Sequence, residues 1–385
     1  KQQLTEVLGA VEGARIAKII GTVSAGEFAG KYIVNKDNLE GKIDQQFEQS
    51  LAKLTINRHR RIKPRRDEKI LVSWNGLMIT SLAKASVIYG HDPYLQAAIK
   101  AGGFIWNNMR TLNGRIIRSH FSGVSGVEGK LNDYAKLAQG FINLYDASGQ
   151  RVWLERAEKL VNIIVTDFAD KKNGDFYASS NIESFARNKP RSDSSQPSAN
   201  ATTLDVISRL SNRLAKPELT RRAEKALAVM SGLAANSPSS GASILTAADA
   251  FLRGEQGAVQ FAGNGAVRIV AMPVSSTGKL EFQLTVAKGW HVNSNQPLEE
   301  DYVATNLIVK ANGKALATET YYPKPIVKTL GFSKSPLALL ESNFQIIAQI
   351  KDTDAATISA ELTVQTCSDE VCLLPETIKL KVPMN

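Results

Sequence analysis

The sequence predicts two domains of different class: an all-α segment of an α/α toroid, followed by an all-β sandwich. Apolar residues recur at helical spacing up to about residue 255 and at alternate positions from residue 267 onward. Between these regions, residues 256–266 are rich in glycine and predict a linker. The chain has 385 residues, 43% of them hydrophobic, which is enough for two or three domains with cores of their own.

Residues 1–255 predict a series of helical hairpins. The predicted helices span 38–62, 77–89, 94–109, 133–145, 153–168, 200–214, 218–233 and 244–252. Two of the links, at 112–117 and 172–177, contain a glycine turn flanked by extended residues. Helical pairs of this kind bury their apolar faces only by stacking on one another. The pattern therefore favours an α/α toroid, here an incomplete one.

Residues 267–385 predict an immunoglobulin-like sandwich. Alternating apolar residues predict strands at 267–271, 279–287, 304–310, 343–351, 357–365 and 377–382. Six to eight short strands in about 120 residues are typical of this fold. The two cysteines of the chain, Cys367 and Cys372, lie between the last two strands. We expect a hairpin there that presents both sulfurs at a sheet edge and not in the core.

The cysteine pair is the most informative feature of the sequence. A bridge between Cys367 and Cys372 would close a loop of six residues, which stabilises a fold by only about 2 kcal/mol. The spacing therefore favours a dithiol that exchanges with a partner. A structural bridge and two unrelated thiols are the alternatives. Neither zinc nor another cofactor is expected, because none of the four histidines lies near the pair in sequence.

Charge and hydropathy narrow the classes of function. The net charge of +10 is partly concentrated in residues 58–66, with six cations among nine residues. No aromatic residue interrupts this run, so a solvated helix end and a loop at Pro64 are favoured over contact with nucleic acid. No stretch reaches 18 apolar residues, so no membrane span is predicted. The chain begins at Lys1 without a signal peptide, and we expect a mature or truncated piece of a longer protein.

Four motifs stand out in the helical part: PRRDEKILVSWNGLM at 64–78, GKLNDYA at 129–135, GDFY at 174–177 and PSAN at 197–200. In order and spacing they resemble the thioredoxin-fused six-hairpin family typified by the spermatogenesis-associated, thioredoxin-like protein. The resemblance implies a thioredoxin-like domain followed by an (α/α)6 barrel similar to sugar epimerases and six-hairpin glycosidases. The thioredoxin-like domain and the first barrel helices are absent here. We expect the N-terminal part of the same protein, or a second chain, to supply them.

Three motifs of the β domain resemble the N-terminal periplasmic domain of the DsbD thiol:disulfide interchange family: Gly289-Trp-His-Val292, Tyr321-Tyr322-Pro323 and Cys367-Ser-Asp-Glu-Val-Cys-Leu-Leu-Pro375. The resemblance implies an immunoglobulin-like fold that takes electrons from a thioredoxin-like partner and passes them to periplasmic disulfides. It also implies an aromatic cap over the cysteines, for which Tyr321 and Tyr322 are the candidates. The Trp and His of the first motif are expected to be core and strand-end residues.

The predicted function is extracytoplasmic thiol:disulfide exchange. Cys367 and Cys372 are the candidate catalytic residues: one thiolate attacks a partner disulfide, and the second cysteine resolves the mixed disulfide. Asp369 and Glu370 lie inside the loop, where carboxylates disfavour thiolates. Such a site suits a domain that reacts only when docked, relaying electrons between a thioredoxin-like domain and an acceptor. An inert bridge in a structural protein is a further hypothesis.

The alternative function is a carbohydrate-active or carbohydrate-binding barrel with the sandwich as an accessory module. Two carboxylates would act as acid and as base or nucleophile, with an indole as a sugar-stacking platform and a histidine as a possible base. The candidate pocket residues are Asp67, Trp74, Asn75, His120, Asp133, Tyr134, Asp193 and Asn200. A structural interpretation competes with this one, because aspartates in such positions also cap helices and tie loops.

Overall fold

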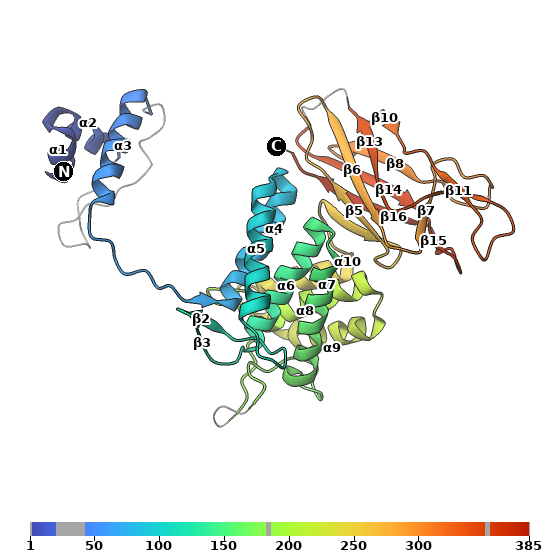
Figure 1. Cartoon of the computed structure of the whole chain (residues 1–385), viewed down its shortest axis with the longest axis horizontal. Helices are drawn as coiled ribbons and strands as arrows, with labels where there is room; N and C mark the ends of the chain where they lie inside the picture. The colour runs from blue at the N-terminus through green and yellow to red at the C-terminus, as the bar shows by residue number, and fades with distance from the viewer. Residues whose placement is uncertain (1, 21–42, 182–185, 351–354, 385) are drawn as a thin grey trace. The chain divides into compact units, whose positions relative to one another are not determined.

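The computed structural model describes residues 2–20, 43–181, 186–350 and 355–384. The chain divides into two compact units, Lys1–Asp67 and Glu68–Asn385 (Figure 1). The boundary lies inside the helical domain predicted at 1–255. That prediction is corrected here, because the chain from 60 to 69 has no regular structure and is exposed.

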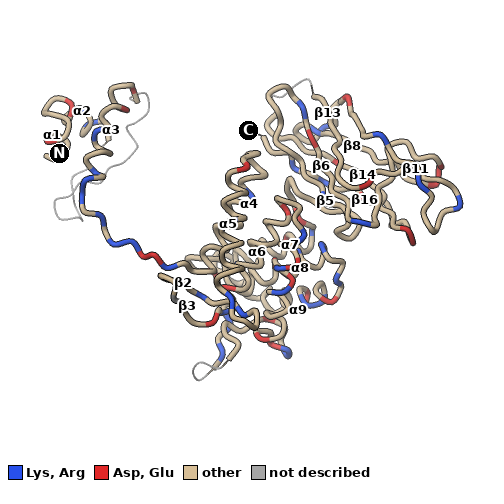
Figure 2. Tube along the Cα trace, in the orientation of Figure 1, with Lys and Arg blue, Asp and Glu red and all other residues tan. Residues whose placement is uncertain are grey.

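The first unit contains three helices, α1 (Gln2–Leu8), α2 (Ala10–Ile19) and α3 (Gln45–His59), around buried Ile16, Ile19 and Phe47. Helix α3 starts at Gln45 because the Asp44 side chain accepts the N–H of Phe47 and caps it. The helix predicted from residue 38 is therefore too long, and its first residues, 38–42, lie outside the described residues. The basic run at 58–66 ends α3 and continues as exposed chain, visible as the dense blue stretch in Figure 2.

The second unit begins with a helical part that confirms the α/α toroid segment. Helices α4, α6, α8 and α10 lie side by side in that order, and α5, α7 and α9 each pack against the helix before them. The bounds of these elements are α4 Val72–Tyr89, α5 Asp92–Asn108, α6 Leu131–Ser148, α7 Arg151–Ile163 with the π-helical turn η1 Ile164–Phe168, α8 Ala199–Leu214, α9 Pro217–Asn236 and α10 Ala242–Arg253. Most residues of α6 and α8 are buried, because both helices have neighbours on two sides.

Glycines decide where several of these helices stop and how close two of them come. Gly90 and Gly149 end α4 and α6 in the left-handed conformation that favours glycine. Gly114 and Gly174 have positive φ in the two predicted turn excursions, which the structure confirms. Gly76 lets α4 meet α6, since a Cβ there would lie 2.6 Å from the Lys136 carbonyl. A three-stranded sheet not predicted from sequence, β1 (Ile70–Leu71), β2 (Ser119–Phe121) and β3 (Val124–Ser125), precedes α6.

The rest of the second unit is a β-sandwich. Its strands are β4 Val259–Ala262, β5 Val267–Ala271, β6 Lys279–Val286, β7 Trp290–Asn293, β8 Asn306–Ala311, β9 Lys314–Ala315, β10 Glu319–Tyr321, β11 Ile326–Lys328, β12 Leu337–Leu340, β13 Asn343–Gln349, β14 Ile358–Val364, β15 Thr366–Ser368 and β16 Glu376–Val382. They form sheets ordered β10-β13-β6-β5-β4, β16-β14-β8-β9 and β11-β12-β7-β15. Strands β6 and β14 bury alternate residues, so the main core lies between the first two sheets.

The strand assignments require two corrections. Strand β4 occupies part of the linker predicted at 256–266, because Val259–Ala262 pairs with β5 and closes one edge of the first sheet. The strands of the third sheet were not predicted. They have three or four residues each, too short for alternation to be visible in the sequence.

The sandwich and the helical part share a buried ion network. Arg213 Nε and Nη1 lie 2.7 and 2.6 Å from carboxylate oxygens of Asp146 and Glu255. Arg209 Nε lies 3.0 Å from Glu255, and Arg268 of β5 donates a 2.8 Å hydrogen bond to the backbone oxygen of Asp146 at the end of α6. These contacts join the two parts across residues 254–258, where a flexible linker was expected.

Candidate functional site

The two cysteines form a disulfide at the turn of a tight hairpin. Cys367 of β15 faces Cys372 directly across this hairpin, and the sulfurs are bonded. The Ser368 N–H donates to the Val371 carbonyl at 2.8 Å, and the Ser368 hydroxyl accepts the Val371 N–H at 3.2 Å. The predicted hairpin is therefore present, and its backbone holds the two cysteines opposite each other.

The two sulfurs have different environments. Strand β15 is an outer strand of its sheet, as expected for a pair at an edge. Cys367, however, is 0% exposed and packs with Leu330, Leu337 and Leu339, whereas Cys372 is partly exposed. The expectation that both sulfurs lie outside a core is wrong for Cys367, because the segment that carries Leu330 covers it. Cys367 is therefore buried, whereas Cys372 is only partly buried.

Aromatic residues other than the predicted ones cover the disulfide. Tyr302 and Phe332 pack on the cysteine cluster. Tyr321 lies in β10 of another sheet and is 53% exposed, and Tyr322 uses its hydroxyl to accept the Leu307 N–H at 2.9 Å. The assignment of the cap to Tyr321 and Tyr322 is corrected accordingly. Tyr321 and Tyr322 were chosen because the Tyr-Tyr-Pro motif belongs to the family resemblance. The segment 329–336 lies against the cysteine loop instead, which only the tertiary structure shows.

The acidic residues of the loop lie on its outer side. Asp369 and Glu370 are exposed at the turn. Asp369 Oδ1 lies 4.0 Å from Lys328 Nζ, and the Asp369 carbonyl lies so close to Gly331 that a Cβ at that glycine would be 2.7 Å away. The 329–336 segment is therefore in contact with the cysteine loop. A role for the two carboxylates in modulating the thiolates stays a prediction.

Polar groups gather beside the buried sulfur. His291 of β7 is the cross-strand partner of Cys367, and its Nε2 lies 3.2 Å from Lys328 Nζ and 3.3 Å from Glu341 Oε2. Asn293 Oδ1 lies 3.9 Å from Cys367 Sγ. Facing positions of an antiparallel pair project their side chains to the same side of the sheet. Trp290 and His291 were predicted to be core and strand-end residues. His291 is the buried second residue of β7, and its pairing with Cys367 could not be seen in the sequence.

Asp133 and Tyr134 of the predicted barrel pocket are structural. Asp133 accepts the Lys130 N–H at 2.9 Å and so closes the first turn of α6. Burial raises the pKa of the Asp133 carboxyl. The hydrogen bond from the Lys130 N–H and the charge of Arg118 act to lower this pKa, but burial outweighs them. Tyr134 is buried, and its hydroxyl accepts the Ile116 N–H at 2.9 Å.

Asp193 and Asn200 also hold backbone in place. Asp193 accepts the N–H groups of Ser198 and Ser243, each at 2.8 Å, at the starts of α8 and α10. Burial alone would raise the pKa of Asp193, but the hydrogen bonds from Ser243 outweigh it and lower the value. Asn200 is fully buried and binds both the N–H and the carbonyl of Phe176 at 2.8 Å.

The remaining candidates of the barrel pocket lie on other elements. Asp67 is an exposed residue at the end of the first unit. Trp74 is 61% exposed on the first turn of α4, and the Asn75 amide donates to the Leu71 carbonyl one turn earlier. His120 lies in β2 with its ring against Phe104. None of the eight predicted residues lines the cavities described below.

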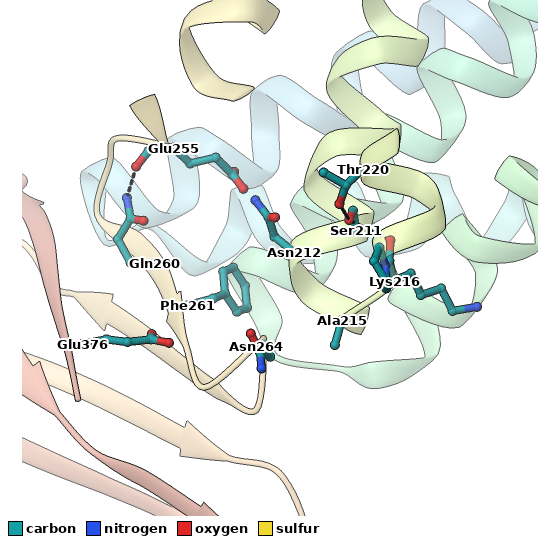
Figure 3. Close-up of a pocket in the computed structure, with 13 residues that line it drawn as sticks. Ser211, Asn212, Ala215, Lys216, Thr220, Glu255, Gln260, Phe261, Asn264 and Glu376 are labelled. Carbon is teal, nitrogen blue, oxygen red and sulfur yellow. Dashed lines mark hydrogen bonds between the residues drawn. The ribbon is translucent and has the colours of Figure 1, made fainter. Parts of the chain in front are cut away.

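Two cavities near the ion network contain none of the predicted pocket residues. One, of about 540 Å³, lies between the end of α8, the start of α9 and β4 (Figure 3). Two hydrogen bonds join residues of its lining: Ser211 bonds to Thr220 at 2.6 Å, and Gln260 donates to the Glu255 carbonyl. The second, of about 340 Å³, is lined by residues that include Lys84, Asp205 and Arg209. No motif in the sequence pointed to either cavity.

The two parts of the chain are similar to different known proteins. Residues 261–383 match the family model described as thiol:disulfide interchange protein DsbD, N-terminal, and this match includes both cysteines. In the N-terminal half, human spermatogenesis-associated protein 20 is 34% identical over 173 residues, which are 42% of this chain and 22% of the relative. The rat protein is 33% identical over 172 residues with the same shares. The chain thus spans about a fifth of the length of the curated relatives it matches.

Solved structures show the same two kinds of neighbour. The DsbD N-terminal domain of Neisseria meningitidis in the reduced form is 15% identical, with a TM-score of 0.26 over 32% of this chain and 90% of that chain. Cellobiose 2-epimerase of Spirochaeta thermophila is 16% identical, with a TM-score of 0.39 over 49% and 55%. The GH76 α-mannanase BT2949 of Bacteroides thetaiotaomicron is 16% identical, with a TM-score of 0.40 over 52% and 62%.

Proposed function

We propose that the protein performs thiol:disulfide exchange through Cys367 and Cys372, relaying electrons between a thioredoxin-like domain and an acceptor disulfide. The observation that supports this most strongly is a disulfide between a buried and a partly exposed cysteine, inside residues that match the DsbD N-terminal family. A bridge that closes so short a loop contributes little to the stability of the fold. Its position at an outer strand suits a reaction with a second protein.

The asymmetry of the sulfurs suggests the order of events. A thiolate of the partner attacks the accessible Cys372 sulfur, the disulfide breaks, and the Cys367 sulfur leaves with the bonding electron pair. The second thiol of the partner then attacks its own sulfur in the mixed disulfide and releases Cys372. The partner ends as a disulfide and this domain as a dithiol. The reverse sequence passes the two electrons to an acceptor disulfide.

We propose an extracytoplasmic location, since stable disulfides persist in oxidising compartments. The matched domain type supports this, because one solved neighbour is the N-terminal periplasmic domain of ScsB from Proteus mirabilis. Among the described residues, no helix is long and apolar enough to cross a membrane. The helical part would then serve as a scaffold that holds the redox domain through the ion network. A carbohydrate site is not favoured, because its predicted residues are engaged in structural hydrogen bonds.

The test is the reduction potential of the Cys367–Cys372 pair, measured on the full chain by equilibration with thioredoxin and alkylation of free thiols. We expect a value between about −120 and −270 mV, the range of proteins that exchange disulfides, and rapid reduction by a thioredoxin-like partner. A potential below about −300 mV, or thiols that do not oxidise, would show that the bridge is structural.

The order of attack has its own test with single-cysteine variants. Cys367→Ser leaves the accessible sulfur, and Cys372→Ser leaves the buried one. The remaining cysteine of each variant is first converted to its thionitrobenzoate disulfide, so that attack by a thioredoxin that lacks its resolving cysteine forms the protein–protein mixed disulfide and releases thionitrobenzoate. We expect this release to be at least tenfold faster for Cys367→Ser than for Cys372→Ser, because access limits the attack. Equal rates, or the reverse order, would contradict Cys372 as the point of entry.

A further inference from the structure

His291 lies in one row with the two cysteines. The pairing of β15 with β7 sets His291 opposite Cys367, and the hairpin sets Cys367 opposite Cys372. Facing residues of antiparallel strands lie on the same side of a sheet with their Cβ atoms about 5 Å apart. The imidazole is therefore the cross-strand neighbour of the buried sulfur. The side chain is 2% exposed, so it is shielded from solvent together with Cys367.

One nitrogen of the ring is occupied and the other is not. Nε2 faces Lys328 of β11 at 3.2 Å and Glu341, just after β12, at 3.3 Å. Nδ1 is buried and has no hydrogen-bond partner in the part of the chain that the structure describes. Buried polar atoms without a partner are rare and costly, and one on the cross-strand neighbour of a reactive cysteine calls for a functional explanation.

The two neighbours of Nε2 determine what Nδ1 can do. The Lys328 ammonium has only protons to give, so a neutral imidazole that accepts from it carries its own proton on Nδ1. If the ring is protonated and paired with Glu341, Nδ1 carries a proton as well. Lys328 is also 4.0 Å from Asp369 in the cysteine loop, so Lys328, Glu341 and Asp369 are the charged groups around this site. In both of these states Nδ1–H is a donor that lacks an acceptor while the disulfide is intact. A neutral ring that donates from Nε2 to Glu341 is the third state, and the contact of Nε2 with the Lys328 ammonium disfavours it.

We propose that His291 is the hydrogen-bond donor for the Cys367 sulfur when the disulfide opens. This inference rests on the proposed exchange function and deepens it. When a thiolate attacks Cys372, the electron pair of the broken bond remains on Cys367, which becomes a buried anion. The Nδ1–H group can then donate a hydrogen bond to the Cys367 thiolate, an acceptor that is absent while the disulfide is intact. His291 thereby stabilises the leaving thiolate, speeds the opening of the disulfide and favours the reduced form.

The experiment compares the full chain with its His291→Asn variant in dithiothreitol redox buffers at pH 7. A small dithiol opens the disulfide without a protein partner. We expect the equilibrium constant for reduction to fall about tenfold in His291→Asn, which is about 30 mV for two electrons. The matched control is His91→Asn, which removes an exposed histidine at the start of α5 in the helical part and should leave the constant unchanged.

Thiolate titration separates this role from a merely structural one. In the Cys372→Ser background, ultraviolet absorbance reports the Cys367 thiolate alone. We expect the pH midpoint of thiolate formation to rise by about one unit when His291→Asn is added, because a donor to the anion is lost. A midpoint that stays in place or falls overturns the proposal.

A second variant keeps the proposal testable if His291→Asn does not fold. Lys328→Met removes the donor to Nε2 and leaves the imidazole in place, so the neutral ring can move its proton to Nε2 and bond to Glu341. We expect the equilibrium constant for reduction to fall about threefold, and an unchanged constant counts against the proposal. If thioredoxin does not reduce the wild-type disulfide but the dithiothreitol constants still differ, the relay function fails and the role of His291 stands.

Discussion

Single polar side chains at the ends of helices hold this fold together. Asp193 serves two helices at once, since one carboxylate oxygen accepts the Ser198 N–H before α8 and the other accepts the Ser243 N–H in the first turn of α10. Asn200 fastens the 169–178 excursion to α8 in a similar way through Phe176. Each of these groups was an equally good catalytic candidate in the sequence, because a capping aspartate and an acid catalyst are the same residue type near a helix start.

Replacement of Asp193 by Ala should lower the free energy of unfolding by about 2–3 kcal/mol, because it leaves donors at the starts of two helices without an acceptor. Chemical denaturation of the full chain measures the change. The matched control is Asp249→Ala, which removes an exposed acid of α10 that pairs with Arg253 and should cost less than about 0.5 kcal/mol. A similar small loss in both variants would contradict the capping role.

At the scale of the helix, close approach of backbones determines the packing. Helices α4 and α6 make the most extensive helix pair of the chain in the described residues, and they can do so because Gly76 and Gly140 have no side chains. Gly76 faces the backbone of Lys136, and Gly140 faces that of Gly76. Gly103 on the neighbouring helix α5 plays no such part, because no atom lies within 4 Å of a Cβ added there.

The replacement Gly76→Ala should destabilise the fold by about 1–3 kcal/mol, because the new Cβ would lie 2.6 Å from backbone atoms that cannot rotate away. Gly103→Ala on α5 is the paired control, since no atom lies within 4 Å of its added Cβ. That change should be neutral or stabilising by up to about 1 kcal/mol, as expected for alanine in a helix. Thermal unfolding of both variants gives the comparison, and the packing argument fails if they shift in the same direction.

At the scale of the second unit, the ion network couples the helical part to the sandwich. Burial alone would raise the pKa of Glu255, but Arg213 and Arg209 outweigh it and lower the value to about 2. Because removal of one partner would leave buried guanidinium groups without compensation, the network resists separation of the two parts. The residues that join them, Glu255 and Arg268, lie on either side of the segment 256–266 that was predicted to be a linker.

The pH dependence of unfolding should reveal this network. The folded pKa of Glu255 lies below its usual value of 4.5, so its contribution to stability is complete above about pH 4.5 and is lost as the pH falls toward 2. In Glu255→Gln this contribution is absent, so we expect a lower melting temperature than that of the wild type at pH 7. Between pH 5 and 3 the melting temperature of the variant should fall less than that of the wild type. Asp249→Asn is the control, since Asp249 lies on the surface of α10. Parallel pH curves for Glu255→Gln and the wild type would contradict the coupling.

From the sequence alone we could predict the two classes of domain, most of the long helices and strands, and the hairpin at the cysteines. The spacing of the two cysteines also indicated the chemistry that such a pair of thiols can perform. These features depend on local periodicity and turn residues, which neighbouring positions encode. Only the tertiary structure decided that Cys367 is buried, that Tyr302 and Phe332 cover it and not Tyr321 and Tyr322, and that His291 lies beside it. It also decided that Asp133, Asp193 and Asn200 serve backbone groups. The physical reason is that cross-strand register and burial bring together residues 24 to 76 positions apart, and no local pattern records such contacts.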